Sequence, residues 1–153
     1  MKKIFIASDH AGYPLKQNLI NKFSDKLINL GTESEENVDY PDFAHELTSQ
    51  INSFPDSLGI LICGSGVGMS ITANRDPNIR AGLVHNAELA KLIRQHNNAN
   101  VLVLPGRFID VQEAIKCVEN FLNTEFESGR HKKRIDKIIK TGSRIAITIS
   151  EKI

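Results

Sequence analysis

Five short apolar runs limit what this chain can fold into more than any other feature of its sequence. Each run is mostly isoleucine, valine and leucine, and none shows the polar alternation that marks a half-exposed strand. The runs are Ile4–Ala7, Leu27–Leu30, Leu58–Cys63, Ala81–Val84 and Val101–Leu104. Strands that are covered on both faces have this pattern. The runs therefore predict a sheet that is buried between two layers.

Amphipathic segments separate the runs and predict the helices of those two layers. Apolar residues recur at helical spacing in three segments, two of which begin beside a proline, a residue that suits the first helical position. They are Leu15, Leu19, Phe23 and Leu27 after Pro14; Phe43, Leu47 and Ile51 after Pro41; and Val111, Ala114, Ile115, Val118, Phe121 and Leu122. This alternation predicts an α/β fold, a three-layer sandwich with a mostly parallel five-stranded sheet. Because the sequence contains no repeat or linker, we expect one domain over residues 1–153.

Composition and charge exclude several classes of protein. With 41% hydrophobic and 24% charged residues, the chain has the make-up of a soluble globular domain rather than of a disordered tail. Its apolar runs are far shorter than the roughly 20 residues of a membrane span, and the first is too short for a signal peptide. A net charge of +1 gives no sign of a nucleic-acid or membrane partner. We expect a cytoplasmic protein with neither partner.

Open parallel sheets bind ligands at the carboxyl ends of their strands, and we expect three such places to carry chemistry here. The first is Ser8–Gly12, directly after the first run. Its neighbouring Asp9 and His10 have side chains suited to sugar hydroxyls, phosphate or a metal. The alternative for Asp9 is a helix cap, which is equally common.

The second place is a glycine-rich loop, Gly64–Gly68, which follows the third run. Glycines at alternate positions let the backbone approach a ligand and expose amide groups at the start of the next helix, which suits an anion. The spacing differs from a dinucleotide fingerprint, a nucleotide-binding P-loop and a nucleophile elbow. The loop is therefore interpreted as an anion cradle that contains the Ser65 hydroxyl.

Cys63 comes directly before this cradle. A cysteine that ends an apolar strand is often only a small buried hydrophobe. A helix N-terminus, however, favours the thiolate form, which acts as a nucleophile or a general base. The second cysteine, Cys117, falls beside an apolar helical stripe, and we expect it to be structural.

The third place is Arg94–Asn100, just before the last run, followed after that run by Arg107. His96 is a candidate for acid–base work near neutral pH, and a cap on the preceding helix is the alternative. The sequence has no Cys-x-x-Cys or His-x-x-x-His pair and no carboxylate cluster with metal-ligand spacing, so we expect neither a metal nor a cofactor.

Two charged stretches and an apolar tail complete the pattern. The acidic stretch around Glu33–Glu46 is interpreted as solvated surface. In the basic stretch, Arg130 and Arg134 share one helical face, which indicates either a solvated surface or a pair of guanidinium groups for one anion. The alternation over residues 145–149 fits either a small strand or a segment packed on a partner.

Taken together, these stretches resemble the type B ribose-5-phosphate isomerases, a family that also holds galactose-6-phosphate isomerase subunits. The resemblance runs from the first apolar run to about Ile139. The matching stretches, in order, are Ser8–Gly12, Gly31-Thr32 with Asp39-Tyr40-Pro41, Ile62–Gly68, Arg94–Asn100, Gly106-Arg107 and Gly129–Arg134. The resemblance implies a Rossmann-like fold and metal-free interconversion of ribose 5-phosphate and ribulose 5-phosphate.

The resemblance also implies a role for each matching residue. Cys63 would take the proton from carbon 2, Ser65 would move or orient protons on the substrate oxygens, and His96 would help to open the furanose ring. The residues implied in substrate binding are Asp9, His10, Asn97 and the cradle residues Gly64, Ser65, Gly66, Val67 and Gly68. Those implied in phosphate binding are Arg107, Arg130 and Arg134. The partners implied are a sugar phosphate and further copies of the chain, in a homodimer or homotetramer with composite active sites.

One departure and two alternatives accompany this resemblance. Serine stands at position 65, where threonine is common in the family, so the hydroxyl is kept and a methyl group is lost. Cys63 marks the branch that uses cysteine rather than glutamate as base. A six-carbon substrate, allose 6-phosphate or galactose 6-phosphate, is one alternative. A sugar-phosphate sensor without turnover is the other.

Overall fold

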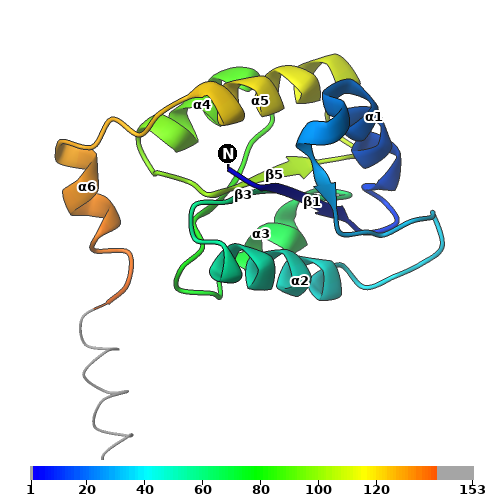
Figure 1. Ribbon diagram of the computed structural model, residues 1–153, viewed down its shortest axis with the longest axis horizontal. Helices are drawn as coiled ribbons and strands as arrows, with labels where there is room; N and C mark the ends of the chain where they lie inside the picture. The colour runs from blue at the N-terminus through cyan, green and yellow to red at the C-terminus, as the bar shows by residue number, and fades with distance from the viewer. Residues whose placement is uncertain (1, 141–153) are drawn as a thin grey trace, which may run out of the picture.

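The computed structural model describes residues 2–140, so the alternating segment 145–149 lies outside the described part of the chain (Figure 1). Five strands form one sheet in the order β2-β1-β3-β5-β4. They are β1 (Ile4–Ser8), β2 (Ile28–Asn29), β3 (Leu58–Cys63), β4 (Ala81–Leu83) and β5 (Val101–Pro105). Every pairing is parallel, and each strand corresponds to one of the predicted apolar runs.

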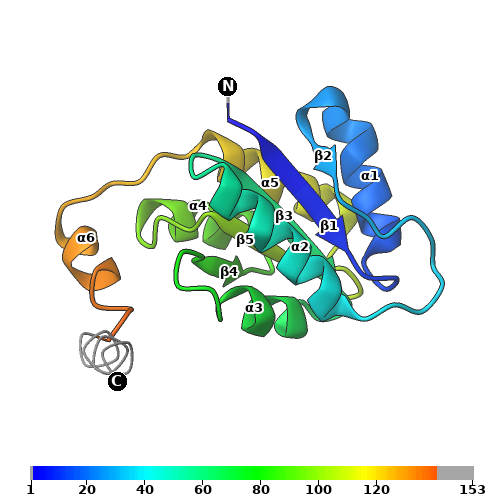
Figure 2. The same cartoon turned by 60° about the horizontal axis from the view of Figure 1, so that its bottom comes forward.

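Helices cover both faces of the sheet, which confirms the predicted three-layer α/β fold (Figures 1 and 2). The helices are α1 (Tyr13–Phe23), α2 (Tyr40–Ser53), α3 (Val67–Ala73), α4 (Ala87–Gln95), α5 (Val111–Asn123) and α6 (Arg130–Ile135). α1, α4 and α5 lie on one face and α2 and α3 on the other. α6 lies apart from these layers, beyond one end of the sheet (Figure 2).

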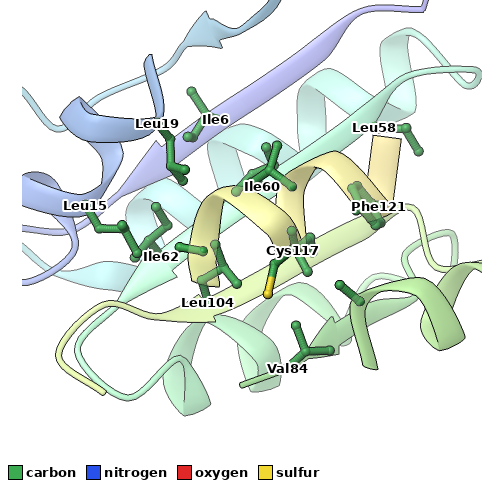
Figure 3. Close-up of a cluster of buried hydrophobic side chains, with 14 of the residues drawn as sticks. Ile6, Leu15, Leu19, Leu58, Ile60, Ile62, Val84, Leu104, Cys117 and Phe121 are labelled. Carbon is green, nitrogen blue, oxygen red and sulfur yellow. The ribbon is translucent and has the colours of Figure 1, made fainter. Parts of the chain in front are cut away.

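The central strands β1, β3 and β5 are buried almost throughout because each face packs against helices. Side chains from β1 and β3, such as Ile6 and Ile60, meet Leu19 of α1 and Phe121 of α5 in the cluster shown in Figure 3. Cys117 lies fully buried in the same cluster. Burial, together with nearby Glu113, raises the pKa of its thiol to about 12, so Cys117 is an unreactive part of the core.

The helical stripe that begins at Leu15 ends earlier than its spacing predicts. α1 stops at Phe23 because Ser24 has a φ of 46° and a ψ of −121°, and a short 3-10 turn, η1 (Ser24–Lys26), follows. Leu27 is therefore extended rather than helical, yet it is buried in the core. The predicted strand Leu27–Leu30 is correspondingly reduced to two residues at the edge of the sheet.

The register of the strands fixes which loops share an edge. Ser8 is level with Ile62, and Cys63 is level with Pro105, so β1, β3 and β5 end together. At the other edge, Gly59 is level with Val101, where β5 begins. Loops that follow the strands and loops that precede them thus lie at opposite edges of the sheet, one strand length apart.

Candidate active site

The loops that follow β1, β3 and β5 are joined by backbone hydrogen bonds at the carboxyl edge of the sheet. Asp9 donates its N–H to the carbonyl of Ile62 at 3.3 Å. Gly106 donates to the carbonyl of Cys63 at 2.8 Å, and Arg107 donates to that of Gly64 at 3.0 Å. The first two predicted places, Ser8–Gly12 and Gly64–Gly68, therefore lie side by side, and Arg107 lies next to them.

The glycine-rich loop turns directly from β3 into α3. Gly66 has a φ of +80°, in the left-handed region that favours glycine, and the first helical hydrogen bond runs from Ser70 N–H to its carbonyl at 3.0 Å. The amides of the helix's first turn thus have no intrahelical acceptor. The Ser65 hydroxyl oxygen accepts the N–H of Val67 at 3.3 Å, which leaves its own proton for another acceptor.

Asp9 and His10 are held by their own loop and by the acidic loop, residues 33–39, which precedes α2. The Asp9 carboxylate is buried and accepts the N–H of Gly12 at 3.0 Å. Gly12 is itself the N-cap residue of α1 and no side chain caps the helix, so the alternative of a helix cap for Asp9 is wrong. The His10 Nδ1 accepts the N–H of Val38 at 3.2 Å. This bond assigns the proton of the neutral imidazole to Nε2, which makes Nε2 a hydrogen-bond donor.

Two longer side chains flank the cradle. Arg107 lies over Gly64: a Cβ atom at Gly64 would stand 3.6 Å from both Cδ and Nη1 of the arginine. Tyr40, at the start of α2, fills the space that a side chain at position 68 would need, so Gly68 is required by this close contact. Tyr40 was not predicted as a site residue, although Asp39-Tyr40-Pro41 is one of the stretches that carry the family resemblance.

His96 and Asn97 lie at the opposite edge of the sheet, and the expectation that this third place shares the carboxyl edge is wrong. Both residues precede β5, and Asn100, just before the strand, accepts the N–H of Gly59 at 2.9 Å on its carbonyl. His96 is the C-cap residue of α4, as its alternative role predicted. Within one chain, the structure does not bring His96 to Cys63.

α6 lies beyond one end of the sheet (Figure 2) and contacts His96 through His131, so the basic stretch also lies away from the cradle. The rings of His96 and His131 stack with their centroids 4.3 Å apart and their planes at 16°. Arg130 and Arg134 are exposed on the same short helix, as their spacing predicts for one face. The predicted site residues thus fall into two groups, one around Cys63 and one around His96.

His131 was not predicted as a site residue, because it stands within a run of basic residues that was interpreted as a whole. Its side chain is buried, and its Nε2 makes no hydrogen bond within residues 2–140, since Glu127 Oε1 is 3.5 Å away. Burial, with Arg130 and His96 adding to it, lowers the pKa of His131 against the opposing effect of Glu127. The ring is therefore neutral near pH 7.

The His96 group contains potential metal ligands that the sequence spacing did not indicate. One ligand atom each from His96, Glu127 and His131 lies within 4.8 Å of the others. The two imidazoles stack face to face, whereas ligands of one ion point their ring nitrogens at it. Arg130 and Arg134 also add positive charge next to these groups. This surface is better suited to an anion than to a cation.

Arg94 organises the segment that carries His96 and Asn97. Its guanidinium is buried, which lowers its pKa, and it donates from Nη1 to the Ala99 carbonyl at 2.6 Å and to Asn98 Oδ1 at 3.1 Å. Its Nε donates to the carbonyl of Thr124, after α5, at 3.2 Å. Arg94 is thus a structural residue of the candidate site rather than a ligand group.

Comparison with known proteins decides the family. The model of the ribose/galactose isomerase family matches residues 4–138. This chain belongs to that family of enzymes. Membership confirms the resemblance drawn from the six sequence stretches, which lie within the same span.

Similar family members include well-covered relatives and solved structures. The probable ribose-5-phosphate isomerase B of Mycoplasma pneumoniae is 48% identical over 140 residues, which cover 89% of this chain and 92% of the relative. Ribose-5-phosphate isomerase B of Escherichia coli is 38% identical over 141 residues, which cover 90% of this chain and 95% of the relative. The crystal structure of ribose-5-phosphate isomerase B from Mycoplasma genitalium with bound ribulose-5-phosphate has a TM-score of 0.85 at 46% identity, and the match covers 92% of this chain and 95% of that chain.

No helix within residues 2–140 is long and apolar enough to cross a membrane.

Proposed function

We propose that this chain interconverts D-ribose 5-phosphate and D-ribulose 5-phosphate through an enediolate intermediate. The observation that carries the proposal is the likeness to the Mycoplasma genitalium structure with bound ribulose-5-phosphate, which covers nearly the whole chain at 46% identity. The glycine-rich loop between Cys63 and α3, with Arg107 beside it, offers the groups that this chemistry needs.

Cys63 is the proposed base. Its thiolate takes the proton from carbon 2 of the open-chain aldose, and the electrons of the C–H bond form the carbon 1–carbon 2 double bond as the carbonyl oxygen becomes an oxyanion. Amides of the cradle hydrogen-bond to that oxyanion. Ser65 passes the hydroxyl proton between the two substrate oxygens, and the thiol returns its proton to carbon 1 to give the ketose.

The sugar is held by the groups at the same edge of the sheet. Asp9 and His10 bind substrate hydroxyls, His10 donating from Nε2 because Nδ1 is already occupied by Val38. The cradle residues Gly64, Ser65, Gly66, Val67 and Gly68 line the reacting carbons. Arg107 contributes positive charge for the phosphate. Such remote binding holds carbon 2 against the base.

The remaining proposed residues act from a second copy of the chain. His96 would help to open the furanose ring, Asn97 would bind the sugar, and Arg130 and Arg134 would bind the phosphate. These four lie across the sheet from Cys63 in one protomer, so they reach a cradle only if they belong to a partner. We therefore propose a homodimer, or a homotetramer built from dimers, with composite active sites.

Isomerisation by purified protein tests the proposal. With EDTA present, we expect ketose formation from ribose 5-phosphate, and we expect Cys63→Ala to lower kcat by several orders of magnitude. Cys117→Ala is the matched control, because it removes the core thiol and leaves the cradle intact. It should keep kcat within about threefold of wild type.

The assay has three further outcomes. Turnover of allose 6-phosphate or galactose 6-phosphate alone would keep the chemistry and overturn the five-carbon substrate. Binding of all three sugars without turnover would replace the enzyme by a sensor. Full activity in Cys63→Ala would remove the proposed base.

A further inference from the structure

Lys16 is a fully buried lysine with no part in the proposed chemistry. It lies in the second turn of α1, and its side chain has no exposed surface. Burial lowers its pKa, although the Glu33 carboxylate at 3.7 Å opposes that effect. A buried ammonium group is unfavourable unless strong acceptors surround it, so its presence here requires an explanation.

The two hydrogen-bond acceptors of Lys16 belong to the short segment from the last residue of β2 to Thr32. The Nζ donates to Asn29 Oδ1 and to the carbonyl of Thr32, each at 2.7 Å. Asn29 Oδ1 also accepts the N–H of Gly31 at 3.0 Å, so one side-chain oxygen joins the lysine to the turn. Lys16 thus fixes the place where the chain leaves the sheet.

That segment is in turn paired with the residue that precedes Asp9 and His10. Ser8 donates its N–H to the carbonyl of Gly31 at 2.8 Å, and Thr32 donates to the carbonyl of Ser8 at 2.9 Å. The acidic loop then runs exposed over residues 33–37 and returns at Val38, whose N–H binds His10 Nδ1. The loop is therefore anchored at both ends, by Lys16 and by His10.

We propose that Lys16 is a positioning residue for His10: by anchoring Asn29 and Thr32 it keeps the Val38 N–H on His10 Nδ1, and so holds Nε2–H as the donor toward the ligand. The inference rests on the proposed function for the identity of that ligand. The tautomer of His10 is independent of any substrate. The positioning role of Lys16 and the proposed function can therefore be disproved separately.

The hydrogen bonds rather than the ion pair carry this role. Glu33 is 72% exposed and lies beyond hydrogen-bond distance of the ammonium group, whereas Asn29 and Thr32 are at 2.7 Å. Solvent screens this exposed carboxylate, so the ion pair contributes little. Glu33→Gln is accordingly a control that should leave His10 unchanged, and Lys16→Met removes the donors while keeping most of the side-chain volume.

The test combines the His10 tautomer with steady-state kinetics. Long-range proton–nitrogen NMR of wild type should show Nε2 protonated and Nδ1 unprotonated on His10, and Lys16→Met should shift both nitrogens toward the averaged values of mixed tautomers. If ribose 5-phosphate is the substrate, Lys16→Met should raise KM about tenfold with kcat within about threefold, since His10 binds the sugar and does not react.

A matched core variant separates positioning from general loss of stability. Val118→Ala truncates a buried side chain of α5 in the core cluster and should alter neither the tautomer nor KM. The proposal is overturned if Lys16→Met leaves the His10 nitrogens unchanged, or if Val118→Ala shifts them equally. A shifted tautomer in a protein that isomerises no sugar would keep the positioning role and remove the proposed substrate.

Discussion

Gly66 holds a backbone conformation that residues with a side chain disfavour, at the point where the cradle becomes α3. A Cβ atom there would also overlap the Leu83 side chain. Gly129, before α6, has a positive φ of 55° as well, but apart from Gly129 and its two chain neighbours no atom of residues 2–140 lies within 4 Å of the Cβ that it would carry. A substitution at Gly66 therefore causes both backbone strain and steric overlap, whereas one at Gly129 causes backbone strain alone.

We predict that Gly66→Ala destabilises the protein more than Gly129→Ala does. Gly66 lies in the left-handed region, and Gly129, with a ψ of −132°, lies in another region that residues with a Cβ atom rarely adopt. Each variant therefore bears about 1–3 kcal/mol of backbone strain. At Gly66, the overlap with Leu83 adds about 1–3 kcal/mol, by analogy with overpacking in a core. Urea unfolding measures both differences. Equal losses would show that Leu83 yields to the new methyl group.

The lowered pKa of His131 predicts that the stability of the protein depends on pH. Its pKa is lowered from 6.5 in the folded chain, so below that value the unfolded chain binds more protons. Its contribution to stability is therefore fully present above pH 6.5 and is lost as the pH falls through the folded-state pKa. His131→Gln should flatten this part of the profile relative to wild type. A steeper profile in the variant would mean that the folded state favours the charged ring.

At the scale of elements, the strands follow from the sequence because runs covered on both faces are continuously apolar. β3 coincides with its predicted run, and β1 and β5 extend theirs by one residue. The end of α1 was missed because an unusual backbone at Ser24 leaves no hydrophobic signal. Hydrophobic spacing locates covered surfaces, and it does not reveal where the backbone leaves a helix.

The cradle, Cys63 and the Asp9–His10 pair follow from the same argument, since residues after parallel strands share an edge. His131 and Tyr40 did not follow, because each lies against residues distant in sequence, His96 and Gly68. The placement of His96 was the main error. Its segment precedes β5, and parallel pairing alone was enough to put it at the other edge.

The hydrogen bonds of Arg94 are expected to stabilise the conformation of the segment before β5. Arg94→Met leaves the buried Ala99 carbonyl and the partly buried Thr124 carbonyl without their donor, and an unpaired buried acceptor costs about 1–3 kcal/mol. We expect the free energy of unfolding to fall by about 2–4 kcal/mol. Arg75, which is exposed, is the matched control, and Arg75→Met should change it by about 0.5 kcal/mol or less. Equal effects in thermal or urea unfolding would contradict a structural role for Arg94.

At the scale of the whole molecule, the proposed catalytic residues are divided between the two edges of one sheet. Cys63 and Arg107 lie where β3 and β5 end, and His96 lies before β5 begins. Parallel strands cannot bring these edges together within a chain. A two-fold dimer places the same pair of surfaces against each other twice, so one interface completes two sites.

The most direct test of this account is complementation between two inactive variants. Cys63→Ala and His96→Ala, each inactive alone, would be co-expressed with different tags, and the mixed dimer would be purified through both. One of its two sites then has both residues intact, so we expect about half the wild-type isomerase activity per dimer. A mixed dimer as inactive as its parents, beside an active wild type, would place Cys63 and His96 in one chain's site and contradict the composite arrangement.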